Sequence, residues 1–321
     1  MDNTKYFPAV EDIQKASGVL EEILEPTPLQ KNPNLSDVYD AQVYLKREDL
    51  QMVRSYKIRG AYNKIRSIAP GVLKYGIVCA SAGNHAQGVA FSCNKLHIMG
   101  SIYMPVTTPR QKIEQVRMFG KEYIDIVLVG DTFDAANAAA IEYAKKSGKT
   151  FIPPFDDQKI IEGQGTIGYE ILSQAKVAPD YVFVPIGGGG LASGVGAYIK
   201  TLSPKTKVIG VEPAGAPCMK VAIEKGEVIE LDQINKFVDG AAVKKAGKLT
   251  YEICKDVLDD IITVPEGAVC TSIIKLYNKS AIVVEPAGAL SIAALKFYKE
   301  EIKGKSVVCI VSGSNNDITR M

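Results

Sequence analysis

The chain has 321 residues, of which 46% are hydrophobic and 23% charged, with a formal net charge of +2. This composition is typical of a globular protein with a substantial core, and the length allows two domains of ordinary size or one large one. No cluster of Lys and Arg among aromatic residues indicates nucleic-acid binding, and no apolar run is long enough to cross a bilayer.

Three further features of the sequence limit the location and the chemistry of the protein. The N-terminal peptide Met1–Lys5 lacks the basic and apolar regions of a secretion signal, which favours a cytoplasmic protein. The six cysteines are irregularly spaced without a C-x-x-C pair, and we expect buried, reduced thiols. The only histidines are His85 and His97, which leaves few residues for a zinc site or a Ser-His-Asp triad. We therefore expect no metal site.

Short apolar runs alternate with helical patterns along nearly the whole chain, which predicts an α/β fold with mainly parallel sheets. The expected strands are Val43–Lys46, Gly76–Ala80, Gly100–Met104, Ile124–Val129, Tyr181–Pro185, Val208–Val211, Ile261–Val264 and Ser306–Val311. The expected helices are Tyr56–Ile68, Asn84–Leu96, Arg110–Phe119, Phe133–Ser147, Ile160–Gln174, Leu191–Leu202, Glu266–Lys279 and Ala287–Tyr298.

Some segments between these elements carry signals of their own. Thr107–Pro109 and Asp156–Asp157 each precede an expected helix and are typical of helix starts. The pair Pro153–Pro154 interrupts both periodicities and marks a crossing between domains. Residues 214–249 are polar and irregular over a length that is unusual for a simple connection, so we expect them to fold over a site.

The peptide Ser55–Gly60 places Lys57 where a helix is expected to begin. A lysine amine is a useful nucleophile only if its pKa falls, and positive potential favours the neutral amine. The helix N-terminus and the neighbouring Arg59 are expected to supply that potential. A Lys/Arg pair on an amphipathic helix is usually a solvated face, so this peptide depends on support from other segments.

The glycine run Gly187–Leu191 lies between an expected buried strand and a helix. Successive glycines let backbone N–H groups converge on an anion, which predicts a phosphate site. A tight turn alone rarely needs four glycines. Gly187, Gly189 and Ala192 also satisfy the G-x-G-x-x-A pattern, with Glu212 following the next strand, so a nicotinamide or flavin cofactor is an alternative. That alternative gives Lys57 no role.

Two further polar segments are candidates for the same site as Lys57 and the glycine run. Ser81–Gly88 follows a strand and opens a helix: Ser81 could be an ordinary N-cap, but the helix start also suits a substrate carboxylate, and Asn84 could donate to a phenolic oxygen. Ser312–Asn316 follows the last expected strand. Ligands of open α/β sheets gather at the carboxyl ends of strands, so we expect all four segments to form one site.

These segments read S-Y-K-I-R-G, S-A-G-N-H-A-Q-G, G-G-G-G-L and S-G-S-N in chain order. Together they resemble the serine/threonine dehydratase family of fold-type II pyridoxal phosphate enzymes over nearly the whole chain. The ending S-G-S-N-N-D makes the chain most similar to the biosynthetic threonine dehydratases within that family.

The resemblance implies a role for each segment. Lys57 would hold pyridoxal 5'-phosphate as a Schiff base, with Tyr56 beside the ring. Asn84 would bond the phenolic oxygen, and Ser312 would face the pyridine nitrogen without enforcing its protonation. The cofactor phosphate would be held by Gly187, Gly188, Gly189, Gly190 and Leu191, and the substrate carboxylate by Ser81, Ala82, Gly83, Asn84 and His85.

The resemblance also implies a fold and a reaction. Two α/β domains of the tryptophan synthase β type, with helices on both faces of each sheet, would enclose the cofactor. Residues 1–50 and 151–321 would form the large domain, and residues 51–150 a small, mobile one. The activity would be β-elimination of water from L-threonine, giving 2-oxobutanoate and ammonia for isoleucine biosynthesis, with L-serine as a poorer substrate that gives pyruvate. Relatives form homo-oligomers, dimers or tetramers.

Three departures from the family pattern carry expectations. Ala82 replaces the serine that racemases use as a second base, which favours elimination over racemisation. Gly210–Cys218 resembles the metal loop of those racemases, but Cys218 replaces a carboxylate ligand, so we expect no divalent ion. The chain ends at Met321 without a C-terminal regulatory domain, from which we expect little inhibition by isoleucine.

Other functions are compatible with parts of this pattern. A serine racemase or another fold-type II enzyme would use the same cofactor, and a dinucleotide-dependent oxidoreductase would use only the glycine turn. A catalytically silent binding subunit would retain the scaffold alone.

Overall fold

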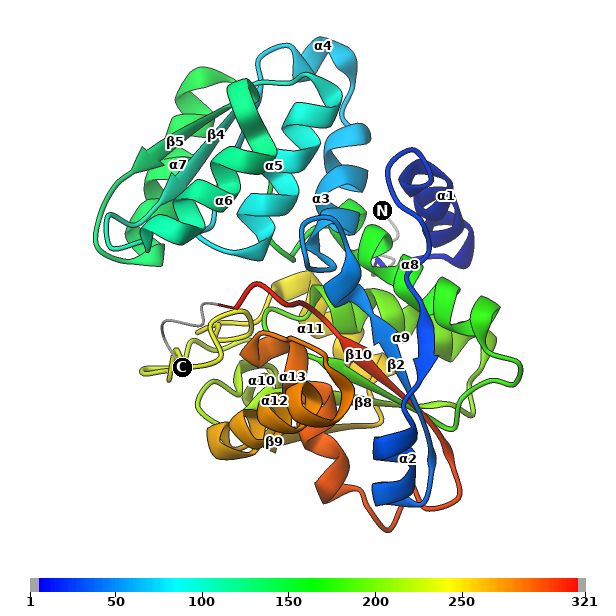
Figure 1. The fold of residues 1–321 in the computed structure, drawn as a ribbon. Coiled ribbons are helices and arrows are strands. Elements are labelled where there is room, and N and C mark those ends of the chain that lie inside the picture. Colours follow the sequence, from blue (N-terminus) through cyan, green and yellow to red (C-terminus); the bar gives the residue numbers. More distant parts are fainter. Residues whose placement is uncertain (1–5, 317–321) are drawn as a thin grey trace.

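The computed structural model describes residues 6–316 and contains two β-sheets (Figure 1). The larger sheet has the order β1-β2-β10-β7-β8-β9, and the smaller has the order β5-β4-β3-β6. Only β1 and β2 pair in antiparallel fashion; the other neighbours are parallel. The predicted α/β class with mainly parallel sheets is confirmed.

The strands agree with most of the expected ranges. They are β1 Leu29–Lys31, β2 Gln42–Arg47, β3 Ile77–Ala80, β4 Gly100–Met104, β5 Ile124–Leu128, β6 Thr150–Phe151, β7 Tyr181–Pro185, β8 Lys207–Pro213, β9 Asp260–Val264 and β10 Ser306–Val311. The helices are α1 Val10–Leu20, α2 Pro33–Tyr39, α3 Lys57–Arg66, α4 Pro70–Leu73, α5 Asn84–Leu96, α6 Arg110–Gly120, α7 Phe133–Ser147, α8 Gln158–Gln174, α9 Gly190–Leu202, α10 Cys218–Lys225, α11 Lys248–Val257, α12 Glu266–Ser280 and α13 Pro286–Ala294.

Helices cover both faces of each sheet, which explains why the central strands are apolar without alternation. Every residue of β7, which reads Y-V-F-V-P, is buried. One face of the larger sheet packs against α12 and α13, and the other against α8 and α9. The smaller sheet packs against α5 and α6 on one face and α7 on the other. Five of the six cysteines are buried and all six are unpaired, as expected.

Helix α3 packs closely on α8, and this contact positions Lys57. A Cβ on Gly163 of α8 would lie 2.7 Å from both Arg59 O and Gly60 Cα of α3. No side chain fits between the two backbones, so the glycines allow an unusually close crossing. The first turn of α3 is similarly close to α5, where a Cβ on Gly88 would lie 3.1 Å from Ile58 N.

Two expected helices are shorter in the structure, and the others agree with the expected bounds to within two residues. The helix expected at 56–68 begins at Lys57 and ends at Arg66. The one expected at 287–298 is α-helical only over Pro286–Ala294, and a single 3-10 turn, Leu295–Phe297, continues it.

Helices α10 and α11 lie within or beside residues 214–249, where the sequence indicated irregular structure. The N-cap residues of these two helices supply no capping side chain. Acidic residues outside the N-cap position accept hydrogen bonds from N–H groups of the first turn instead. Glu212 accepts hydrogen bonds from two N–H groups of α10, at 2.8 and 2.9 Å. Asp156 accepts from the first three N–H groups of α11, while its neighbour Asp157 caps α8 as predicted. The pair Asp156–Asp157 therefore caps two helices rather than one.

The sequence also gave no signal for five further elements: α1, α2, α4, β1 and β6. All but α1 have seven residues or fewer, and α1 has no capping side chain at its start. Among residues 6–316, no helix combines the length and apolar character needed to cross a membrane.

Candidate active site

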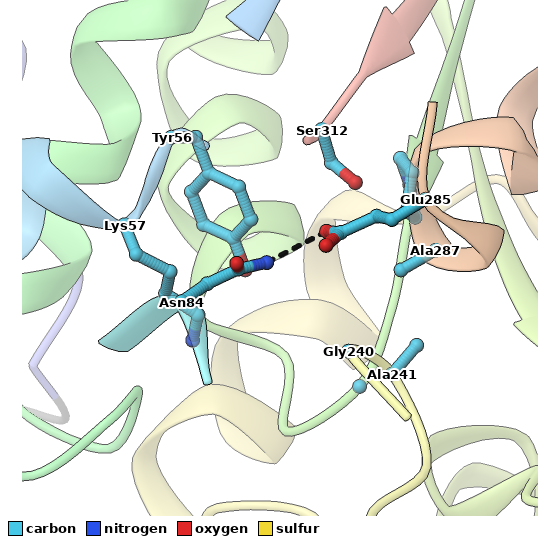
Figure 2. A pocket seen from close by; sticks show the side chains of 10 residues that line it. Tyr56, Lys57, Asn84, Gly240, Ala241, Glu285, Ala287 and Ser312 are labelled. Atoms are coloured by element: carbon cyan, nitrogen blue, oxygen red, sulfur yellow. Dashed lines mark hydrogen bonds between the residues drawn. The ribbon is translucent and has the colours of Figure 1, made fainter. Parts of the chain in front are cut away.

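A pocket lies at the carboxyl end of the larger sheet, beside the first turns of α3 and α5 (Figure 2). It encloses about 280 Å³ of empty space, which includes open solvent at its mouth. All four segments singled out in the sequence contribute to it. The lining residues are Tyr56, Lys57, Asn84, Pro185, Gly187, Gly240, Ala241, Glu285, Ala287 and Ser312.

Lys57 is the first residue of α3, and its half-buried side chain lines this pocket. Tyr56 N donates to Ser312 O at 3.2 Å, which ties the start of α3 to the end of β10. Lys57 Nζ donates to Pro154 O at 2.7 Å. Burial lowers the pKa of Lys57 to about 8, against the opposing effect of the Glu285 carboxylate. The neutral amine is therefore accessible near neutral pH, as a nucleophile or base requires.

The cause of this low pKa differs from the prediction. Arg59 was expected to supply positive potential, but its guanidinium is buried in two ion pairs. Arg59 Nε lies 2.8 Å from Glu48 Oε2, and Arg59 Nη1 lies 2.6 Å from Glu170 Oε1. Because two carboxylates surround this cation, its charge is compensated, and burial of the Lys57 amine remains the dominant cause.

The loop of residues 187–192 turns its carbonyl groups toward the protein. Gly188 O accepts from Thr250 Oγ1 at 2.6 Å, and Gly189 O accepts from Ser193 N at 2.8 Å. Within the described part of the chain, no N–H group of residues 187–192 donates to a backbone carbonyl. Free N–H groups at a helix start suit an anion, so this loop fits the phosphate of the expected cofactor.

Packing also requires these glycines, so the tight-turn interpretation and the phosphate interpretation are both supported. A Cβ on Gly188 would overlap the Phe155 ring. Gly189 has φ +97°, and a Cβ there would lie 2.5 Å from Met219 Cε. The sequence pattern indicated the anion site but not these packing contacts, which come from distant segments.

Ser312 and Asn84 present polar groups to the same pocket. Ser312 follows β10, is buried and lines the pocket. A serine hydroxyl in this place can bond a ring nitrogen. Asn84 Nδ2 donates to Glu285 Oε1 at 2.6 Å, which is the dashed line in Figure 2.

The start of α5 has no capping side chain. Its N-cap residue is Gly83, and Ser81 Oγ accepts from Gly83 N at 3.2 Å, so Ser81 closes the preceding turn and does not cap the helix. A Cβ on Gly83 would meet no atom within 4 Å, so space is available here. An open helix start beside free space is suited to a carboxylate.

Of residues 81–85, Asn84 is the one among the lining residues, and the side chains of Ala82 and His85 make contacts elsewhere. Ala82 packs against the core of the smaller sheet. The His85 ring is buried, and its Nε2 lies 3.0 Å from Ile152 O. Burial and the nearby Lys57 lower the pKa of His85 to about 3, so the ring is neutral and donates to that carbonyl.

Glu285 is a pocket residue that the sequence analysis missed. It is the N-cap residue of α13 and is buried, and burial raises its pKa to about 7, with Asp239 adding to the effect. The sequence did contain a signal for a buried acid at this position, because Glu285 directly precedes Pro286 and a helix made only of apolar and small residues. An acid in that position has little chance of reaching solvent.

An ion pair joins two distant segments near the pocket. Lys112 of α6 lies 2.6 Å from Asp239, which immediately precedes the lining residues Gly240 and Ala241. The irregular region of residues 214–249 thus reaches both the pocket and the helices of the smaller sheet.

The loop that resembles a metal site is bonded internally. Glu212 binds the N–H groups of α10 and not a side-chain cation, and Cys218 Sγ lies 3.5 Å from Gly187 O. Burial raises the pKa of Glu212 to about 7. Residues 6–316 contain no group of three or more His, Cys, Asp or Glu side chains that could hold a metal ion.

Comparison with known proteins gives the context of this pocket. Residues 20–313 match the family described as pyridoxal-phosphate dependent enzyme. The biosynthetic L-threonine dehydratase IlvA of Halalkalibacterium halodurans is 60% identical over 312 residues, which cover 97% of this chain and 75% of that protein. The protein of the same name from Bacillus subtilis is 56% identical, with coverage of 97% and 74%.

Two solved structures, a threonine deaminase and a serine racemase, superpose closely on this chain. The processed threonine deaminase isoform 2 of Solanum lycopersicum superposes with a TM-score of 0.93 at 40% identity, covering 97% of this chain and 85% of that one. Maize serine racemase superposes with a TM-score of 0.92 at 28% identity, covering 98% and 96%. These comparisons do not favour the dinucleotide-dependent oxidoreductase.

Proposed function

This chain belongs to the family of pyridoxal-phosphate-dependent enzymes, and we propose that it is a threonine dehydratase. It converts L-threonine to 2-oxobutanoate and ammonia by β-elimination of water, and L-serine to pyruvate as a secondary activity. The observation that carries the proposal is the half-buried Lys57 with its lowered pKa, which shares one pocket with Gly187 and Ser312. This is the combination needed to hold an aldehyde, a phosphate and a pyridine ring.

The residues present fit this cofactor. Lys57 Nζ would be the point of covalent attachment, with Tyr56 beside the ring and Ser312 Oγ toward the ring nitrogen. Asn84 would bond the phenolic oxygen. The phosphate would be held by Gly187, Gly188, Gly189, Gly190 and Leu191. When bound, pyridoxal phosphate supplies an aldehyde that condenses with amines and a conjugated ring that accepts an electron pair.

Lys57 also moves a proton. Once substrate occupies the pocket, the free Lys57 amine removes the proton from the substrate Cα, which its lowered pKa permits. The β-hydroxyl leaves with one proton as water, which balances the proton that Lys57 takes from Cα. The resulting enamine reacts with water to give the keto acid and ammonia. The substrate carboxylate is bound at the start of α5 by the segment Ser81, Ala82, Gly83, Asn84 and His85.

Ala82 favours elimination over racemisation. Racemisation at Cα needs a proton donor on the face opposite Lys57, and an alanine methyl group cannot supply a proton. Elimination needs only the one base. We therefore propose that elimination exceeds racemisation with L-serine as substrate.

We further propose that the chain works as two domains and as a homo-oligomer. Residues 1–50 and 151–321 form the large domain, and residues 51–150 form a small domain that moves. The presence of two separate sheets supports this division, although β6 pairs with β3 just beyond the boundary. We propose a dimer or tetramer in the cytoplasm that serves isoleucine biosynthesis.

The test uses the full chain purified with pyridoxal phosphate. Its visible spectrum is recorded, the bound cofactor is trapped with borohydride, and the labelled peptide is mapped by mass spectrometry. Keto-acid and ammonia formation are measured from L-threonine and L-serine, and D-serine formation is measured in parallel. Gel filtration gives the oligomeric state.

The expected result is a label on Lys57, with keto acid formed faster from threonine. Lys57→Ala should abolish both the label and the activity, while Lys146→Ala on the exposed face of α7 should change neither. A label on another lysine, or cofactor-loaded protein that releases no ammonia from either substrate, would contradict the proposal.

A further inference from the structure

The side chain of Asn84 is held in a single orientation by a chain of hydrogen bonds. Asn315 Nδ2 donates to Val53 O at 2.9 Å, and because a carbonyl can only accept, the amide nitrogen of Asn315 must face it. The same nitrogen donates to Asn84 Oδ1 at 2.8 Å. The amide nitrogen of Asn84 is therefore turned toward Glu285, whose Oε1 it contacts at 2.6 Å.

Glu285 is buried without an ion pair. Its carboxylate accepts from the Asn84 amide and from the backbone N–H of Asn315. The charged groups that influence it are Asp239, Lys112 and Lys57, and none of them forms a salt bridge with it. A buried carboxylate without a cation is costly for folding, which points to a role in the pocket.

The surrounding backbone makes room for this carboxylate. A Cβ on Gly313 would lie 2.5 Å from Glu285 Oε1, and a Cβ on Gly240 would lie 3.4 Å from it. Two glycines from separate loops thus face the acid. Figure 2 shows Glu285 on the same side of the Tyr56 ring as Ser312, with its carboxylate directed at Asn84.

We propose that Glu285 is a positioning residue that acts through Asn84. The Asn84 amide has two hydrogens. The carboxylate holds one, and the other is left for the phenolic oxygen of pyridoxal phosphate. This inference rests on the proposed function, and it assigns Glu285 to the orientation of the cofactor ring.

The test is a double-mutant cycle on the affinity of the cofactor-free protein for pyridoxal phosphate. The variants are Asn84→Ala, Glu285→Ala and the double variant, with affinity measured by spectroscopic titration. Asn84→Ala should weaken binding about tenfold, the value of one hydrogen bond to a charged oxygen. Glu285→Ala should weaken it by a similar factor, and the double variant should bind no more weakly than Asn84→Ala.

A conservative variant and a spectrum separate positioning from a general structural effect. Glu285→Gln keeps an acceptor oxygen and should recover most of the affinity. The absorbance maximum of the bound cofactor should shift in Glu285→Ala in the same direction as in Asn84→Ala. Glu162→Gln, at a buried glutamate outside the pocket, should leave both affinity and spectrum unchanged.

If the two losses of affinity add, the double variant will bind pyridoxal phosphate about 100-fold more weakly than the original protein. Glu285 would then act independently of Asn84, and the inference would be overturned. Unchanged affinity in Glu285→Ala would overturn it as well. If the unaltered protein bound no pyridoxal phosphate, the proposed function would fail and this inference with it. The Glu285 variants remove an uncompensated buried charge and should fold. Asn84→Ala keeps that charge and loses one of its donors, so urea denaturation of each variant verifies that it is folded before the titration.

Discussion

Two regions of this molecule bury carboxylates next to the helix that carries Lys57, and the two sets differ in charge balance. The Arg59 network, which consists of Lys46, Glu48, Arg59 and Glu170, contains two cations and two anions. Glu285 has no cation partner. Arg59 and Lys46 hold the pKa of Glu48 below its usual range despite burial, whereas burial raises the pKa of Glu285 to about 7.

The comparison shows that burial alone does not determine the protonation state of an acid. Desolvation acts on both glutamates, but opposite charges within contact distance reverse its effect in the network. The network therefore joins β2, α3 and α8, and loss of one partner would leave buried charges uncompensated. Glu285 has no such partner, and its protonation state can respond to the pocket.

Removing Arg59 should have the largest effect. Arg59→Met leaves two carboxylates buried without their main partner, so the free energy of unfolding should fall by about 3–5 kcal/mol. Urea denaturation of the cofactor-free protein measures this change. Arg66→Met provides a control on the same helix, because Arg66 pairs with Glu22 at the surface and its loss should cost less than about 1 kcal/mol. Equal losses in both variants would contradict the distinction.

The second prediction concerns pH. The folded pKa of Glu285, about 7, lies above its ordinary value of 4.5. Protonation therefore favours the folded state: this contribution is complete below pH 4.5 and is lost as pH rises through 7, a change of about 3 kcal/mol. Glu212 adds a similar slope, so the comparison is between the original protein and Glu285→Gln in cofactor-free form. The variant should show a flatter stability profile between pH 5 and 8, and an unchanged slope would rule out this assignment.

The third change removes one hydrogen bond from the network. Thr27 Oγ1 donates to Glu48 Oε1 at 2.5 Å. Thr27→Val keeps the shape but removes the donor, and the free energy of unfolding should fall by about 1.5–3 kcal/mol, as expected for a bond to a charged group. Thr201→Val is the control, since the Thr201 hydroxyl bonds only a carbonyl of its own helix. Urea denaturation at pH 7 measures both changes, and equal losses in the two variants would contradict the assignment.

The smallest effect is expected at the surface. Lys112→Met removes the ion pair with Asp239 and should change the free energy of unfolding by less than about 1 kcal/mol. Lys112 also lowers the pKa of Glu285, so its loss should move the pH dependence of Glu285 to higher pH. Stability measured across pH 5–9 tests both statements. A shift to lower pH would show that the electrostatic assignment is wrong.

Most of the candidate site could be predicted from short segments. Lys57 at a helix start, the glycine run and Ser312 after a buried strand each have a signal within a few residues, because strand ends and helix starts are local features. The run of four glycines has two causes, close packing and the proposed phosphate site. The sequence alone could not distinguish between them. Phe155 and Met219, which force two of those glycines, are more than 25 residues from them along the chain.

The charged groups were predicted less well, because their partners are remote. Arg59 was assigned to Lys57, its neighbour in sequence, but it pairs with Glu170, 111 residues away. Asp156 was assigned to the helix that follows it, but it caps α11, more than 90 residues further on. Local spacing carries no information about which distant carboxylate reaches a given cation.

The sequence by itself determined the α/β class, most helix and strand positions and the four segments that meet in the pocket, since hydrophobic periodicity and turn chemistry act over a few residues. Only the tertiary structure decided which acids are paired and which is free. Glu285 meets Asn84 across 201 residues of chain, and the pKa of a buried group depends on all charges that the fold brings near it. Electrostatic state is therefore a property of the folded molecule.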